Sequence, residues 1–396
     1  KNTASGSFAL YSNTTGCNNT AMGDCALHDN TTGCLNVAIG RHALVNNTTA
    51  NYNTAVGFET LCCNTTGAYN TASGYKALRL NTTGGCNAAF GVLALEDNTT
   101  GCQNVAIGSS ALCSNTTACF NTAVGGCSLF ANTTGANNTA VGYTALKANT
   151  CGNCNTALGN AALACNTTGY NNTALGFIAL CCNTTGHSNV AIGRNSLRVA
   201  TSNLNTAIGA YALTDNTTGT ENTATGYIAL GDNTTGSENT AYGHYALRLN
   251  TTGSCNVGIG PHSLYTNTTG AKNIAIGRVA MYKNTSGCLN TASGFYALRN
   301  NTTAHYNTAV GSCALYSNTT GERNVAVGSS ALLTSTTGCR NVAFGDSAGY
   351  AITTGMRNTL LGHGAGVAVT TGSHNTGSGY KVFNFLTTGC FNVATG

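Results

Sequence analysis

A seventeen-residue repeat organises the whole chain and limits the folds that it can adopt. Asparagine is the first residue of each repeat unit, at every seventeenth position from Asn2 to Asn172. The consensus of the unit is N-T-A-x-G-x-x-A-L-x-x-N-T-T-G-x-x. The frame slips once, in the sixteen-residue unit 189–204, and then continues from Asn205 to Asn392. Twenty-three units and a short stub thus follow one another without a composition break. Such self-similarity indicates a repeat architecture in which each unit packs on its neighbours.

Each unit is typical of β-structure. It carries several Gly, Thr and Asn residues and no helical apolar spacing beyond one turn, so helices are excluded. A short β-run such as 36–39, a Gly turn, a second run around Ala-Leu and a Thr-Gly turn would complete one coil. One coil cannot bury its apolar face alone, so we expect coils to stack as parallel strands about 4.8 Å apart. The sequence predicts an all-β parallel β-solenoid (β-roll or β-helix) of about 23 coils with 17 residues per coil. Its expected shape is an elongated rod of roughly 110 Å.

The repeat also predicts the organisation of the chain and the role of its constant positions. We expect one continuous solenoid over 1–396, with sequon-bearing coils in 1–340 and variant coils in 341–396. Ala at position three, Gly at position five and Leu at position nine suit a narrow interior and a tight corner. Asn at position one is expected to form a hydrogen-bonded ladder along the stack. Both ends of the chain lie in mid-pattern, which predicts self-association into a filament or fibre.

Composition and motifs argue against several partners and activities. Only 7% of the residues are charged, and the formal net charge of +5 comes from residues scattered singly along the chain. No basic stripe is seen, so no nucleic-acid partner is expected. No apolar run approaches about 18 residues, so we expect neither a membrane span nor a signal peptide.

No arrangement of catalytic or metal-binding residues recurs along the repeat. Cys151 and Cys154 have no second pair or histidine at ligand spacing, which favours a structural disulfide or free thiols over zinc. The string 362–366 imitates a phosphate loop, but its first Gly is the corner of the repeat. We therefore expect no catalytic residue, no metal, no cofactor and no enzyme activity. The histidines are expected on the surface, at His28, His42, His187, His244, His262, His305, His363 and His374.

A sequon recurs at position twelve of the unit. Each Asn-Thr-Thr is an acceptor for N-glycosylation, although N-T-T-G is also a good turn. We expect the motif at an exposed bend, where covalent N-linked glycans would supply the solubility that the few charges do not. The predicted glycosylation sites are Asn13, Asn30, Asn47, Asn64, Asn81, Asn98, Asn115, Asn132, Asn166, Asn183, Asn216, Asn233, Asn250, Asn267, Asn284, Asn301 and Asn318.

Twenty cysteines favour an oxidising compartment and therefore an extracellular or cell-surface location. Stacked coils place equivalent Cα atoms about 4.8 Å apart, inside the window of about 4.4–6.8 Å for a disulfide. Free thiols that serve as small apolar residues are the alternative. The shared phase predicts the disulfides Cys17–Cys34, Cys102–Cys119 and Cys165–Cys182.

The last coils depart from the pattern at position twelve. The sequon is lost from Ser335 onward, and the Leu at position nine becomes Gly in two of these coils. Stacking would align Ile352, Val369 and Leu386 in one apolar column. This column either fills the void left by the missing Leu or stays outward as a contact strip. The coincident loss and gain of a large residue favours the core.

Two strings resemble a known class of surface proteins. They are N-V-A-I-G, at 36–40, 104–108 and 189–193, and N-T-L-L-G-H-G-A-G at 358–366. The strings resemble the head repeats of trimeric autotransporter adhesins and the related repeats of tail-fibre-like proteins that end in an endosialidase-type chaperone domain. The resemblance implies a parallel β-roll on a surface-exposed fibre that is often trimeric and adhesive. The present unit is longer than the usual adhesin unit, richer in Cys and marked by a sequon.

Three functions follow as expectations. The first is a structural repeat protein of a glycan-coated extracellular filament or surface fibre, without catalysis. The alternative is an adhesin or a viral or phage tail-fibre shaft, which the resemblance supports. Ice binding comes third, because the adjacent threonines at positions thirteen and fourteen cannot both point the same way along a strand.

Overall fold

The computed structural model describes all residues 1–396 and consists of short strands and turns, with no helix. It confirms an all-β parallel β-solenoid of about 23 coils with about 17 residues each. A helix of the length and apolarity that a membrane crossing requires is absent. The chain forms two compact units, residues 1–201 and residues 202–396, and each is described by itself.

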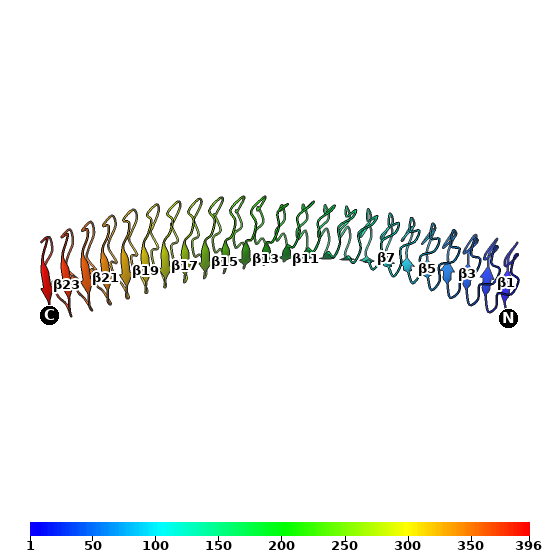
Figure 1. The fold of residues 1–396 in the computed structure, drawn as a ribbon, viewed down its shortest axis with the longest axis horizontal. Coiled ribbons are helices and arrows are strands. Elements are labelled where there is room, and N and C mark those ends of the chain that lie inside the picture. The colour runs from blue at the N-terminus through cyan, green and yellow to red at the C-terminus, as the bar shows by residue number, and fades with distance from the viewer. The chain divides into compact units, whose positions relative to one another are not determined.

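The first unit is built from strands of three residues, each one coil after the last (Figure 1). Neighbouring strands pair in parallel with a register of one repeat, so that Thr3 lies opposite Thr20 and Thr20 opposite Val37. The strands are β1 (Thr3–Ser5), β2 (Thr20–Met22), β3 (Val37–Ile39), β4 (Thr54–Val56), β5 (Thr71–Ser73), β6 (Ala88–Phe90), β7 (Val105–Ile107), β8 (Thr122–Val124), β9 (Thr139–Val141), β10 (Thr156–Leu158), β11 (Thr173–Leu175) and β12 (Val190–Ile192).

The second unit repeats the same arrangement. Its strands also pair in parallel with a register of 17 residues, as Thr206 with Thr223 and Ala207 with Ala224. The strands are β13 (Thr206–Ile208), β14 (Thr223–Thr225), β15 (Thr240–Tyr242), β16 (Val257–Ile259), β17 (Ile274–Ile276), β18 (Thr291–Ser293), β19 (Thr308–Val310), β20 (Val325–Val327), β21 (Val342–Phe344), β22 (Thr359–Leu361), β23 (Thr376–Ser378) and β24 (Val393–Thr395).

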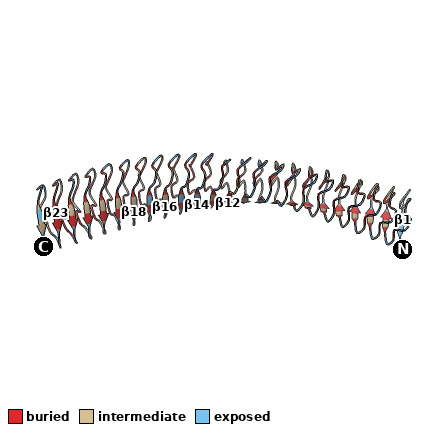
Figure 2. Cartoon of the chain, in the orientation of Figure 1, coloured by how far each residue is buried: buried red, intermediate tan, exposed pale blue.

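The core of each unit is a thin column of small and medium side chains. The middle residue of the strand points inward, as Ala38 does, while its two neighbours face outward (Figure 2). Ala43 and Leu44 from the following turn are also fully buried. Because only these few apolar positions per coil are enclosed, the interior depends on repetition along the stack rather than on a wide core.

A tight turn follows each strand and bends the chain back. Gly23 begins it with φ +136°, and a Cβ there would stand 2.6 Å from the carbonyl oxygen of Gly40 in the next coil, so only glycine fits. Cys25 and Leu27 then adopt left-handed φ angles of 55° and 49°, which are uncommon for residues with a side chain. Hydrogen bonds between coils hold this conformation, as the Leu27 amide donates to the Ala43 carbonyl at 3.0 Å. The left-handed residues were not foreseen, because only the glycine corner was expected to need positive φ.

The asparagine at position one forms the expected ladder. The Oδ1 atom of Asn36 accepts a 2.9 Å hydrogen bond from the Asn53 amide one coil later. Its Nδ2 atom donates to the Ala50 carbonyl at 2.8 Å. This side chain is fully buried, so the ladder satisfies both its own polar groups and those of the backbone.

Candidate functional site

The sequon asparagines at position twelve are the first candidate site, and the structure places them in the interior. Asn13 is half-buried, and the other sixteen are fully buried. The Nδ2 atom of Asn98 donates to Asn81 Oδ1 at 2.8 Å and to the Gly101 carbonyl at 2.9 Å. Position twelve is therefore a second asparagine ladder, and the expectation that it lies at an exposed bend is wrong.

This geometry bears directly on glycosylation, because Nδ2 is the atom that would carry the sugar. A glycan there would replace a hydrogen that bonds inside the core and would need space where the next coil is stacked. The threonine after the asparagine is also engaged, since Thr99 Oγ1 donates to the Thr116 carbonyl at 3.0 Å. The N-T-T repeat is thus explained by packing, and a glycan on a buried sequon asparagine would break these hydrogen bonds.

The cysteines are all free thiols, and no two sulfurs lie at the bonded distance of about 2.0 Å. The coil register nevertheless aligns two of the expected pairs. The sulfurs of Cys17 and Cys34 are 3.0 Å apart, and those of Cys102 and Cys119 are 2.7 Å apart. A hydrogen bond from Cys17 lowers the pKa of the Cys34 thiol and raises that of Cys17. The pKa of Cys102 is raised to about 11, first by its hydrogen bond with Cys119 and then by burial.

The structure does not show a simple thiol pair for Cys165 and Cys182, or a disulfide between Cys151 and Cys154. Cys181 contacts both Cys165 and Cys182, so the third expected pair has a competing thiol between its members. Burial and these two neighbours raise the pKa of Cys181 to about 12. Cys151 and Cys154 are exposed free thiols. These five thiols therefore form no disulfide in this structure.

The variant column of the last coils belongs largely to the core. Ile352 and Val369 are fully buried and Leu386 is half-buried, so the outward contact strip does not describe the first two. A Cβ at Gly366 would stand 2.6 Å from the side chain of Leu360, which replaces the usual small residue at position three. Leu360 thus occupies the space of the missing Leu at position nine, a compensation that sequence reasoning missed.

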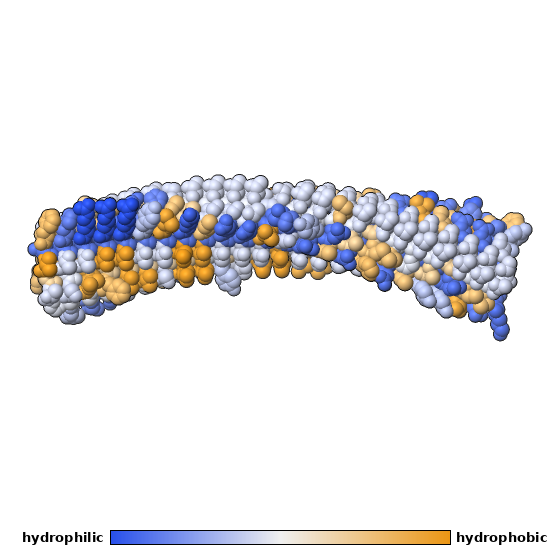
Figure 3. Space-filling model, viewed as in Figure 1, coloured by the Kyte–Doolittle hydropathy of each residue, from blue (hydrophilic) through white to orange (hydrophobic).

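An uncharged face of the β-sheet is a further candidate surface. The first and third residues of every strand point outward, and none of them is charged in either unit. Many are aliphatic and about two-fifths exposed, as Ile107 and Ile276 are at 42% each. Figure 3 shows apolar side chains in a band along the strand-bearing side of residues 202–396. Sequence reasoning placed variable residues outward but did not identify this face.

A column of arginines corrects the expectation that the basic residues are scattered singly. Arg323, Arg340 and Arg357 all occupy position seventeen, so stacking places them about 4.8 Å apart. All three side chains are exposed. Figure 3 shows a hydrophilic block near the C-terminal end of residues 202–396. Three arginines are fewer than the six to ten phosphate contacts of a typical nucleic-acid interface, so the column does not predict such a partner.

An open recess of about 270 Å³ lies on the second unit, beside Tyr227, Asp232 and Arg248. It exists because Gly231 stands where neighbouring coils carry larger side chains. Burial raises the pKa of the Asp232 carboxyl, while the nearby Arg248 lowers it. Arg248 also donates to Tyr265 Oη at 2.8 Å. The recess is therefore lined by an acidic residue, Asp232, and a basic residue, Arg248, whose charges partly offset each other.

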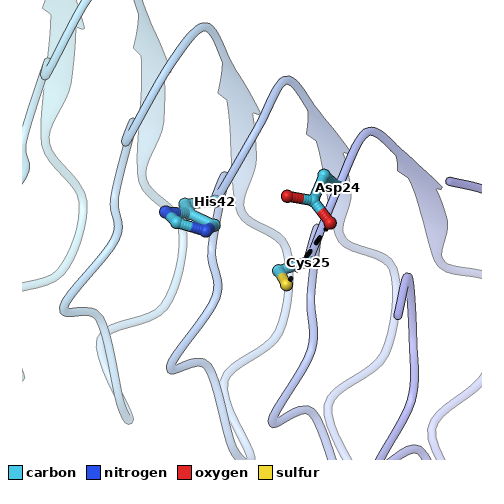
Figure 4. A group of neighbouring side chains, drawn as sticks. All are labelled: Asp24, Cys25 and His42. Carbon is cyan, nitrogen blue, oxygen red and sulfur yellow. Dashed lines mark hydrogen bonds between the residues drawn. The ribbon is translucent and has the colours of Figure 1, made fainter. Parts of the chain in front are cut away.

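The last candidate is a mixed group of side chains at the turns after β2 and β3. Asp24, Cys25 and His42 place a carboxylate oxygen, a sulfur and an imidazole nitrogen within 4.8 Å of one another (Figure 4). Burial, followed by the charge of Asp24, raises the pKa of the Cys25 thiol. Arg41, which directly precedes His42 in the next coil, places its Nε 3.6 Å from Asp24 Oδ2. The sequence carried a signal for this group, since Cys25 and His42 share position seven of consecutive coils.

Comparisons with known proteins close the description of these sites. No family model, no curated protein and no solved structure matches the chain. The resemblance to adhesin heads is therefore retained only at the level of the fold, a parallel β-solenoid of about 23 coils.

Proposed function

We propose that this protein is a structural, self-associating β-solenoid of an extracellular filament or surface fibre. The observation that carries the proposal is the uncharged strand face, which extends over all strands of each unit. Interface cores are depleted of charged residues, whereas other positions of this repeat carry Lys, Arg, Asp and Glu. The glycan coat expected from the sequence has no part in this proposal, because the sequon asparagines are buried and hydrogen-bonded.

The size of the face fits an interface between chains. Twelve strands spaced about 4.8 Å apart, each about 10 Å long, give one unit a face on the order of 500 Å². Contact between two such faces would bury on the order of 1,000 Å² in total, which is where specific interfaces begin. Most third residues of the strands are apolar, and the largest exposed apolar patch of a monomer is often functional.

A second copy of the chain is the partner that fits best. Its strands have the same spacing, so side chains of one stack can enter the gaps of another at every coil. Its face is also uncharged, so association leaves no buried charge unpaired. A partner without this period would match only at isolated places.

Lysine substitutions in this face test the proposal. We expect the parent chain to associate in sedimentation velocity and to form fibres under the electron microscope. Ile107→Lys and Ile276→Lys should abolish both, because each buries a charge in the interface. The matched controls Thr100→Lys and Thr269→Lys, at exposed position fourteen, should associate as the parent does. A monomeric parent at tens of micromolar, or equal association of all four variants, would refute the proposal.

An oxidising location outside the cell is part of the same proposal. The aligned thiols of Cys17 with Cys34 and of Cys102 with Cys119 support it, because the register brings each pair close enough for a disulfide after a small rotation. Disulfide bonds between adjacent coils would oppose the separation of the coils in a fold with a thin core.

A further inference from the structure

We propose that Asp24, Cys25 and His42 form a binding site for a divalent zinc ion on the outside of the first unit. The inference is independent of the proposed assembly, because none of the three residues belongs to the uncharged strand face. Carboxylate, thiolate and imidazole are the three side-chain donors that zinc uses in proteins. A mixed set of oxygen, sulfur and nitrogen ligands favours zinc over calcium or magnesium, which prefer oxygen alone.

The backbone holds the three residues in place before any metal binds. The Cys25 amide donates to the Ser7 carbonyl at 2.8 Å, and the His42 amide donates to the Asp24 carbonyl at 3.0 Å. Cys25 and His42 also share the left-handed conformation, with φ angles of 55° and 56°. Figure 4 shows the two side chains on adjacent coils, with a hydrogen bond from Cys25 to Asp24. Fixed positions of this kind reduce the entropy lost when a ligand binds.

The spacing of the donor atoms is close to that of a tetrahedral site. The Cys25 sulfur is 3.7 Å from Asp24 Oδ1, and all three donors lie within 4.8 Å of one another. Zinc bonds of about 2.0–2.3 Å in tetrahedral geometry place neighbouring donors roughly 3.3–3.8 Å apart. Small side-chain rotations close the difference at this exposed turn. Three protein ligands leave one position for water, as in sites that are open to solvent.

Arg41 is the group that opposes the cation most directly. Its guanidinium is 3.6 Å from Asp24 and lies over the ring of Phe58, with the guanidinium carbon 5.9 Å from the ring centre. The side chain of Arg41 is 60% exposed, so its ion pair with Asp24 is weak and can open toward solvent. Displacing it leaves Asp24 Oδ2 available to the metal.

The repeat supplies matched controls within the same molecule. Cys127 and Cys313 occupy the same position as Cys25 but follow Gly126 and Ser312, so they have no neighbouring carboxylate. Asp346 and His363 form a similar pair at 3.7 Å, but no cysteine stands beside them. Among the groups of this repeat, three donors of different kinds meet only where Asp24, Cys25 and His42 are stacked.

Zinc protection of Cys25 from alkylation tests the site. The full chain is reduced with a phosphine, and iodoacetamide labelling of each cysteine is followed by peptide mass spectrometry with and without zinc chloride. We expect zinc to slow labelling of Cys25 at least about tenfold and chelation to restore it, because a metal-bound thiolate is a poor nucleophile. Labelling of Cys127 and Cys313 in the same samples should not change.

Variants of the other two ligands decide between a site and a lone thiol. Asp24→Asn and His42→Ala should each remove most of the protection of Cys25, whereas Asp346→Asn should leave it intact. Alanine is tolerated at this position, since Ala161 adopts φ 54° at the equivalent place. Unchanged labelling of Cys25 in zinc would overturn the proposal. Protection that survives both ligand variants would also overturn it, because Cys25 would then bind zinc without them.

Discussion

The Nδ2 atom of Asn47 donates a 2.8 Å hydrogen bond to Oδ1 of Asn30, and both side chains are fully buried. The same bond recurs from coil to coil, so the Nδ2 atom of each asparagine donates to the Oδ1 atom of the asparagine one coil earlier. Burying a single amide without partners costs about 1–3 kcal/mol, but a continuous ladder removes that cost at every step except where it is interrupted. The ladder is therefore strong only as long as it is complete.

Serine at position 335 interrupts this ladder and offers the first prediction. Its Oγ atom and Asn318 Oδ1 in the coil before it are both buried without hydrogen-bond partners. Ser335→Asn should supply a donor to Asn318 and to the Gly338 carbonyl, as the equivalent asparagines do elsewhere. We expect the free energy of unfolding to rise by about 1 kcal/mol, measured by urea denaturation.

The reverse substitution in an intact part of the ladder is the control for this prediction. Asn115 donates to Asn98 at 2.8 Å and accepts from Asn132 at 3.0 Å. Asn115→Ser should lower the free energy of unfolding by about 1–3 kcal/mol, because it leaves two buried groups without partners. Equal stability of both variants and the parent would show that the ladder bonds contribute nothing net.

The exchange of volume between Leu360 and Gly366 gives the second prediction. Leu360→Ala should cost about 2–5 kcal/mol, because it opens a cavity that the glycine cannot fill. Gly366→Leu alone should also destabilise the coil, since its Cβ would lie 2.6 Å from Leu360. The double variant restores the Ala and Leu of the consensus, and we expect it to recover most of the loss. A double-mutant cycle by denaturation measures this coupling, and additive losses would contradict it.

The period of the sequence was sufficient to predict the fold. A unit of 17 residues with a Gly corner and a buried Ala and Leu led directly to parallel coils, and the pairing of Thr20 with Val37 confirms the register. The same register identified which cysteines lie side by side, as the contact between Cys102 and Cys119 shows. These features depend only on counting along the repeat.

The environment of each position could not be predicted in the same way. Asparagine is usually exposed, so Asn98 was placed on the surface, whereas its partners in the neighbouring coils make burial favourable. The charge count treated Arg323 and Arg340 as isolated, although stacking makes them neighbours. His42 was likewise treated only as a surface histidine, although Cys25 lies one repeat before it. In a solenoid each residue must be compared with those one repeat away before its surroundings are inferred.

The thiol pairs give the third prediction, which concerns rates of oxidation. Oxidised glutathione should link Cys17 to Cys34 faster than Cys102 to Cys119 near pH 8. The pKa of Cys34 is lowered, so more of it is the nucleophilic thiolate, whereas its partner Cys17 and Cys102 of the second pair both have raised pKa values, that of Cys102 about 11. Each disulfide releases two electrons and two protons, which reduce one glutathione disulfide to two thiols. Non-reducing peptide maps over time measure both rates, and the reverse order would contradict the prediction.

The arginine column gives the last prediction. Arg340 lies between Arg323 and Arg357 in the stack, at the bend before each strand, and like charges about 4.8 Å apart on neighbouring coils repel one another. Arg340→Glu replaces the repulsions from Arg323 and Arg357 by attractions but adds a repulsion from Glu322, which lines the same hollow, so we expect the free energy of unfolding to rise by about 0.5 kcal/mol at low salt. Arg340→Gln removes only the repulsions and should give about half of that gain.

Salt distinguishes this charge effect from a change in packing. The Debye length falls from about 30 Å at 0.01 M salt to about 3 Å at 1 M, so both gains should shrink as sodium chloride is added. Urea denaturation of the parent, Arg340→Glu and Arg340→Gln at both salt concentrations measures the effect. Lys147→Glu is the control, because its neighbours at position ten are Phe130 and Ala164, and it should change stability little. A gain for Arg340→Glu that persists at 1 M salt would mean that the arginines do not repel one another in the folded chain.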